Sequence, residues 1–209
     1  MKNLQKYLMI LGTIMLSIGI SACSKQPDFD AKSYVQSSLD AYYHGEYKDY
    51  ANLLELSEKD AKKEIEEDFN ESIQQQFNDS DNITDKGIAD YAEKLTEVKK
   101  LAKYKVQDEK KDEDGNYTVS VKVEPSDVFQ TLQQSSAEVS KEKIAQGMKE
   151  TDPGVFASVL TESVQKSIDE NSYGDPVTVT VKMEKNHSGT YELSETERSK
   201  LETAMFPTE

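Results

Sequence analysis

Apolar residues in the first half of the chain recur every three or four positions between polar ones. This spacing puts them on one face of an α-helix, so it predicts amphipathic helices over residues 30–45, 47–54, 57–77 and 84–101. Gly45 is the expected stop of the first helix, because glycine readily adopts the left-handed conformation that ends helices. Ser57 and Asp60 resemble a capping box, which satisfies free amides at a helix start.

From Tyr104 onward the period changes to two, which is typical of a half-buried β-strand. Residues 104–106 begin a strand, residues 112–116 form a turn, and the strand that follows has alternating apolar positions at Tyr117, Val119, Val121 and Val123. A second hairpin shows the same alternation, with a turn over 186–189 and apolar positions at Val177, Val179, Val181, Met183, Tyr191 and Leu193.

Helical spacing returns between and after the hairpins. Residues 128–148 predict a weak helix that is split near Ser140, with apolar positions at Val128, Leu132, Ile144 and Met148. A helix with the strongest apolar face of the chain is expected to begin at Asp152 and to carry Val155, Phe156, Val159, Leu160, Val164 and Ile168. A complete capping box over 194–197 predicts the last helix.

Two hairpins with one apolar face, and helices to cover that face, predict an α+β fold. We expect a four-stranded antiparallel sheet with several helices packed mainly on one side, in a single domain over residues 30–209. The arrangement resembles the cystatin-like and NTF2-like half-wrapped sheets of small bacterial lipoproteins.

The first 29 residues have a different pattern. Lys2 and Lys6 precede an uncharged, largely apolar run over residues 7–20, as in a secretory signal peptide. Ile20, Ser21, Ala22 and Cys23 follow, and this tetrapeptide resembles a bacterial lipobox. The resemblance implies that residues 1–22 are removed by cleavage between Ala22 and Cys23, that a diacylglycerol is attached to Cys23, and that residues 23–29 are a tether. An uncleaved anchor and an ordinary signal peptide are the alternatives.

Charge and cysteine content restrict the function classes. Residues 1–22 hold two of the 25 basic side chains and none of the 40 acidic ones, so the remainder carries a formal charge of −17. Nucleic-acid binding needs a basic patch, and the balance argues against it. With Cys23 as the single cysteine, no internal disulfide or thiolate zinc site can form.

Candidate chemistry is sparse. His44 and His187 have no partner at metal-site spacing, and capping or surface roles are expected for both. Ser-x-x-Lys occurs at Ser140 and Ser163 without the companion elements of penicillin-recognising enzymes. Residues 112–116 resemble the start of a calcium loop, but a hairpin turn is the better interpretation. We therefore expect no catalytic residue, metal or cofactor, although a carboxylate pair for glycoside hydrolysis cannot be recognised from sequence.

A cluster of tyrosines carries the remaining resemblance. Residues 40–50, with Tyr42, Tyr43, Tyr47 and Tyr50, and residues 57–61 are similar to a domain of unknown function in lipoproteins of low-GC Gram-positive bacteria. The predicted role is a non-catalytic binding module for an unknown protein or small molecule; an extracytoplasmic hydrolase and a cell-envelope assembly factor are the alternatives. Tyr50 is expected to be structural. One of Tyr42 and Tyr43 is expected to be exposed, and Tyr43 or Tyr47 to border a ligand site where helices leave the sheet uncovered.

Overall fold

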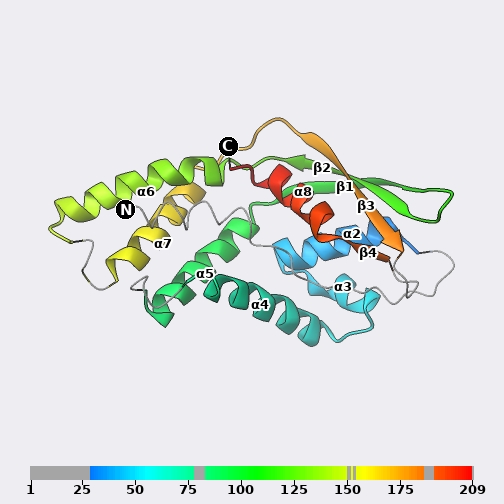
Figure 1. The fold of residues 1–209 in the computed structure, drawn as a ribbon, viewed down its shortest axis with the longest axis horizontal. Coiled ribbons are helices and arrows are strands. Elements are labelled where there is room, and N and C mark those ends of the chain that lie inside the picture. Colours follow the sequence, from blue (N-terminus) through cyan, green and yellow to red (C-terminus); the bar gives the residue numbers. More distant parts are fainter. Residues whose placement is uncertain (1–28, 78–82, 150–151, 153, 186–190, 209) are drawn as a thin grey trace.

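A computed structural model describes residues 29–77, 83–149, 152, 154–185 and 191–208. Its antiparallel sheet has the strand order β1 (Lys103–Lys111), β2 (Tyr117–Glu124), β3 (Val177–Lys185) and β4 (Tyr191–Leu193) (Figure 1). Val119 lies opposite Val181 across the β2–β3 pair, and Val121 lies opposite Val179. Burial alternates along β2, so one face of the sheet forms the core.

The prediction of a four-stranded sheet made of two hairpins was wrong. Three strands of eight or nine residues build the sheet, whereas β4 has three residues and pairs only with the end of β3, from Met183 to Lys185. The strand is short because Ser194 follows it directly and caps the next helix by accepting a hydrogen bond from the Glu197 amide. Ser194 cannot both continue the strand and cap the helix, so β4 ends at Leu193.

Two helices cover the buried face of the sheet. Helix α2 (Ala31–Leu39) packs on β1 and β2, and α8 (Glu195–Met205) packs on β3 and β2 (Figure 1). Their apolar sides, including Tyr34, Val35, Leu201 and Met205, are at most 2% exposed. Burial of such side chains away from water is the main stabilising contribution to the fold.

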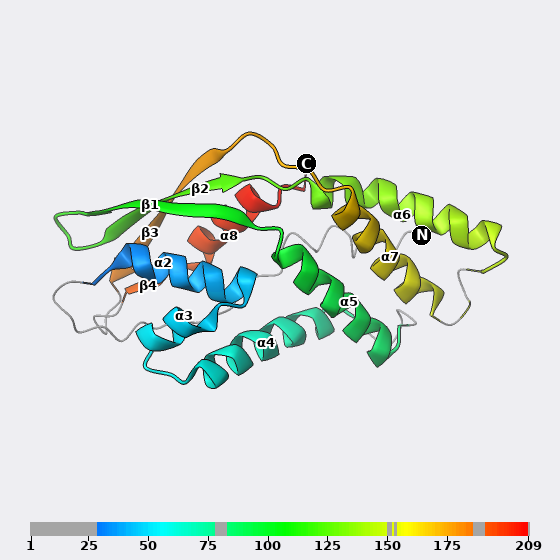
Figure 2. The same ribbon diagram turned by 180° about the vertical axis from the view of Figure 1, so that it is seen from behind.

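The remaining helices extend beyond the sheet rather than covering it. Helix α5 (Asp85–Lys99) packs on α7 (Val155–Asp169), which pairs with α6 (Val128–Ala145), and α4 (Glu58–Gln74) lies between α5 and the short helix α3 (Tyr47–Leu53) (Figure 2). The expectation that the helices pack mainly on one side of the sheet therefore fails for α4 to α7.

Helix α6 also corrects the predicted break near Ser140, since it runs unbroken through that residue. Ile144 and Met148 were counted in its apolar face but are 54% and 40% exposed. Ile144 lies in the last turn of α6, and Met148 lies three residues past its end. At these two positions the apolar spacing does not indicate a buried side chain.

Ser57 caps α4 as predicted, and α2 and α5 begin with the same kind of contact. Asp30, Ser57 and Thr84 each accept a hydrogen bond from the amide three residues later, at 2.8, 3.1 and 3.1 Å. Such caps contribute about 1 kcal/mol each. Among the described residues no helix has the length and hydropathy needed to cross a membrane.

The C-terminal segment joins the sheet to the helical extension. The Ser126 amide donates to the Met205 carbonyl at 2.8 Å, just after β2 ends. The Phe206 ring packs 6.0 Å from the Tyr43 ring and 5.8 Å from the Phe129 ring. The end of the chain therefore lies directly behind the tyrosine cluster.

Candidate functional site

A cleft of about 680 Å³ opens between α4, α5 and the turn that follows α2. A stripe along α4 forms one wall and a stripe along α5 forms the other, while the end wall comes from the π-helical turn η2 (Asp40–His44) and the start of α3. The volume suits a small ligand, for which sites of 300 to 1,000 Å³ are common. Its lining combines aromatic, apolar and charged groups: Tyr42, Tyr43, His44, Tyr47, Lys62, Glu66, Phe69, Asn70, Gln74, Asp85, Ile88, Ala92, Glu93, Thr96, Lys99 and Lys100.

The end wall is built on the π-helical turn. Gly45 ends that turn with φ +71°, a left-handed conformation that favours glycine, and the Glu46 amide donates back to the Asp40 carbonyl. Gly45 was the predicted helix stop, and the structure confirms it. The chain then turns sharply into α3, which brings Tyr47 to the same cleft as Tyr43.

Tyr42 and Tyr43 are both buried, at 6% and 3% exposure, so the expectation that one of them is exposed was wrong. The two rings point in different directions, but both directions are covered. Tyr42 packs against Phe69 of α4, whereas Tyr43 packs against Tyr104 of β1 and Phe206.

Tyr47 is half-buried at the cleft and its hydroxyl donates to Glu66 across a long 3.5 Å contact. Glu66 also pairs with Lys62, one turn earlier on α4, at 3.7 Å. The predicted residues Tyr43 and Tyr47 thus lie at one cleft. That cleft is between helices, however, and not at an uncovered part of the sheet as expected.

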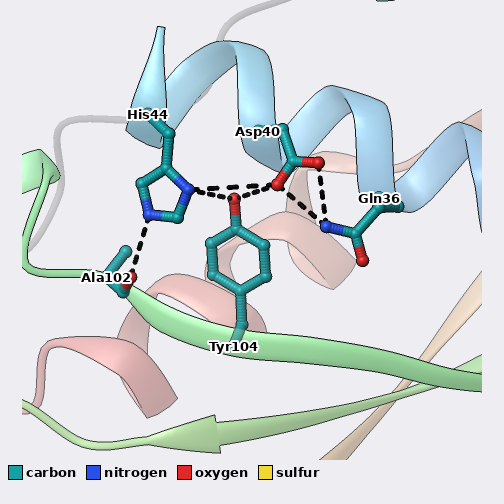
Figure 3. A network of polar contacts seen from close by, with 5 residues as sticks. All are labelled: Gln36, Asp40, His44, Ala102 and Tyr104. Carbon is teal, nitrogen blue, oxygen red and sulfur yellow. Dashed lines mark hydrogen bonds and ion pairs between the residues drawn. The ribbon is translucent and has the colours of Figure 1, made fainter. Parts of the chain in front are cut away.

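A network of polar contacts fixes the end wall to the sheet (Figure 3). The Tyr104 hydroxyl, from β1, donates to the Asp40 carboxylate at 2.7 Å, and the Gln36 amide donates to both oxygens of the same carboxylate at 2.8 and 2.9 Å. Burial, together with the hydrogen bond to Asp40, raises the pKa of the Tyr104 hydroxyl far above its usual value, so this group stays a donor.

His44 extends this network to the end of α5. Its Nε2 lies 3.0 Å from the Ala102 carbonyl and must donate, because a carbonyl oxygen only accepts. Its ring stacks on the Tyr104 ring at 5.1 Å, with Nδ1 3.3 Å from the Tyr104 oxygen (Figure 3). Ala102 lies between the C-cap of α5, Lys100, and the start of β1, so His44 bonds the link between these two elements and does not cap a helix.

Lys99 lines both the cleft and a smaller cavity behind it, and its ammonium has an unusual environment. Its ammonium is 3.8 Å from the centre of the Tyr42 ring and 4.1 Å from the centre of the Phe69 ring. Such cation–π contacts contribute about 0.5 to 2 kcal/mol each. Burial lowers the pKa of the Lys99 ammonium to about 8, and the negative charges of Glu66 and Glu202 oppose that shift.

Glu202 lies behind this lysine. It comes from α8 and lines, with Lys99 and Phe206, a cavity of about 30 Å³ at the back of the tyrosine cluster. Burial raises the pKa of the Glu202 carboxyl to about 8, although the positive charge of Lys99 acts in the other direction. Burial therefore favours the neutral form of both groups, while the charge of each favours the charged form of the other.

The Ser-x-x-Lys pairs and the acidic turn over residues 112–116 do not line the cleft. Across the described ranges, no group of three or more His, Cys, Asp or Glu residues is arranged to hold a metal ion. The Ser-x-x-Lys pairs are engaged elsewhere: Ser163 donates to the Val159 carbonyl, Lys166 pairs with Glu138, and Lys143 pairs with Glu162. Asp112 accepts from the Asn116 amide in a hairpin turn, as preferred over a calcium loop.

Sequence reasoning missed Asp40, Tyr104, Lys99 and Glu202. Lys99 had a signal, because it follows Tyr91 and Leu95 at four-residue steps and so falls on the buried face of α5. Glu202 lies about a hundred residues further along the chain, so no spacing rule links the two. Ala22, Cys23 and His187 lie outside the described residues.

The fold has a counterpart among solved structures. It is similar to a crystal structure of the predicted lipoprotein YcdA from Bacillus subtilis, with 14% sequence identity and a TM-score of 0.58. The match covers 84% of this chain and 56% of the YcdA chain, so the chain spans little more than half the length of that protein. At this identity the likeness shows a shared fold. No protein-family model matches the sequence, and no curated protein matches it.

Proposed function

We propose that the protein is an extracytoplasmic lipoprotein that is held at the cell membrane by a diacylglycerol on Cys23. The order of a basic start, an apolar run and the Ile-Ser-Ala-Cys tetrapeptide supports this, and so does the fold shared with a predicted lipoprotein. Residues 30–209 would then be a domain held outside the membrane by a short tether. The net charge of −17 after residue 22 makes anchoring by lipid more favourable than docking on anionic lipid.

We further propose that this domain binds a small ligand without transforming it. The observation that carries this role is the 680 Å³ cleft, in which Tyr43, Tyr47, His44 and Lys99 come together from three separate elements. Ligand sites combine apolar and aromatic side chains with convergent polar groups, and both kinds line this cleft. The network of Tyr104, Asp40 and His44 supports the role, because it holds the end wall in one position before any ligand binds.

The lipid anchor is tested by replacing Cys23 with alanine. Thioether attachment needs the cysteine sulfur, so the Cys23→Ala protein should incorporate no fatty-acid probe when cells are labelled metabolically, and it should be lost from the membrane fraction. Ser24→Ala, next to it, should label like the wild type. Equal labelling of the Cys23→Ala and wild-type proteins would show that the anchor lies elsewhere.

The binding role is tested by covalent capture. A photoreactive residue placed at Tyr47 in the membrane-anchored protein should crosslink the ligand in intact cells, because that position is half-buried at the cleft.

A further inference from the structure

The Lys99 ammonium lines the cleft without a carboxylate in contact with it. Among the described residues no carboxylate forms an ion pair with this ammonium, which lies over the Tyr42 and Phe69 rings. A buried charged donor without an acceptor is unfavourable, because it has lost its contacts with water.

The protein's own carboxylates do not complete this site. Glu202 lines the small cavity behind Lys99 without an ion pair to it, and burial raises the pKa of its carboxyl, which favours the neutral form. Glu66 has two partners of its own, Lys62 at 3.7 Å and the Tyr47 hydroxyl at 3.5 Å. The Lys99 ammonium is therefore open to an anion from outside the protein, although the chain as a whole carries a charge of −15.

From this arrangement we infer that the cleft takes a small ligand with an anionic oxygen group, a carboxylate or a phosphate, which accepts from the Lys99 ammonium. The inference rests on the proposed binding role and names its ligand class. The rest of the ligand lies along α5, where Ile88, Ala89 and Ala92 form an apolar strip on the wall. An ammonium removed from water binds an anion far more strongly than a surface lysine does, because the surrounding dielectric screens it less.

Three probes of one size test the charge requirement. Benzoate, benzamide and benzylammonium share a ring and differ in charge, and their binding to the full-length protein in non-ionic detergent is measured by calorimetry at pH 6.5. Benzoate should bind saturably, benzamide at least tenfold more weakly, and benzylammonium more weakly still. Inorganic phosphate is a further probe: if it binds more tightly than benzoate, the group is a phosphate, and if not, a carboxylate.

One variant and a matched control locate the binding. Lys99→Met keeps the apolar stem and should weaken benzoate binding at least tenfold. Lys63→Met removes the same charge from the outer face of α4, where Lys63 pairs with Glu67, and should leave binding unchanged. Equal binding by the Lys99→Met variant, or by the three benzene probes, would overturn the inference.

The pH dependence of benzoate binding by the wild-type protein is a test that does not depend on whether a variant folds. The groups that face Lys99 are Glu66 from α4, Glu202 from α8, and Tyr42 with His44 from the end wall. Benzoate binding should weaken at least tenfold between pH 6.5 and 9.5, as Lys99 loses its proton and Glu202 gains a charge. Affinity that stays constant over this range would contradict the inference. If benzylammonium binds instead and depends on Tyr47, the anion inference fails while the proposed binding role stands.

Discussion

Replacing Tyr50 with alanine is expected to lower the free energy of unfolding by about 3 to 5 kcal/mol, the usual cost of removing a buried aromatic ring. Tyr50 is 1% exposed and lies on α3, which packs against both α2 and α4. For a domain of this size the loss corresponds to a melting temperature lower by about 10 °C or more. Thermal and urea unfolding of the two proteins measure it.

Tyr50→Phe is the matched control. The Tyr50 hydroxyl is buried without a hydrogen-bond partner, so its removal takes away a group that is costly to bury. The phenylalanine variant should be as stable as the wild type or more stable. An alanine variant that melts like the wild type would show that Tyr50 is not part of the core.

Replacing Glu202 with glutamine is expected to flatten the pH dependence of stability between pH 5 and 8. The pKa of this carboxyl is raised from 4.5 to about 8 on folding. The folded protein therefore keeps a proton that the unfolded chain releases, and the stability that this proton gives is present below pH 4.5 and lost as pH rises through 8. The wild type should lose roughly 2 to 4 kcal/mol over that range relative to the Glu202→Gln protein.

Urea unfolding at several pH values measures this slope. Glu195→Gln makes the same charge change at an exposed site of the same helix, and it should keep the slope of the wild type. Lys99 acts outside this range. Its lowered pKa costs stability at neutral pH, and that cost disappears only as the pH rises from 8 to 10.5. Identical slopes in the wild type and the Glu202→Gln protein would contradict the assignment of a buried, protonated carboxyl.

Local signals in the sequence predicted the helices well. Asp30, Ser57, Thr84 and Ser194 are caps because a short side chain bonds an amide three residues away, and both partners are neighbours in the chain. The alternation at Val119, Val121 and Val123 predicted the buried face of β2 for a similar reason.

The errors arose where distant parts of the chain decide the outcome. Ile144 and Met148 have apolar spacing, but they lie in the last turn of α6 and just past its end, and both side chains are exposed. The order of the elements gave no sign that α4 to α7 extend beyond the sheet, because tertiary packing determines which face an amphipathic helix covers. The extent of β4 depends on where α8 begins.

The candidate site was predictable only in part. Tyr43 and Tyr47 were expected from a local cluster of aromatic residues, and both line the cleft. Lys99 and Glu202 meet because the C-terminal helix returns to the tyrosine cluster, a contact that no local pattern encodes. The network of Asp40 and Tyr104 joins residues 64 positions apart and was missed for the same reason.

The claim that this cleft binds a small ligand is tested most directly by photocrosslinking in intact cells. A benzophenone-bearing residue is placed at Tyr47 and, as a matched control, at Tyr173, a partly buried tyrosine whose hydroxyl donates to the Leu101 carbonyl away from the cleft lining. Mass spectrometry of the purified protein should find a small-molecule adduct at position 47, reduced when Lys99 is also replaced by methionine, and none at position 173. Equal adducts at the two positions, or no adduct at position 47, would contradict the account.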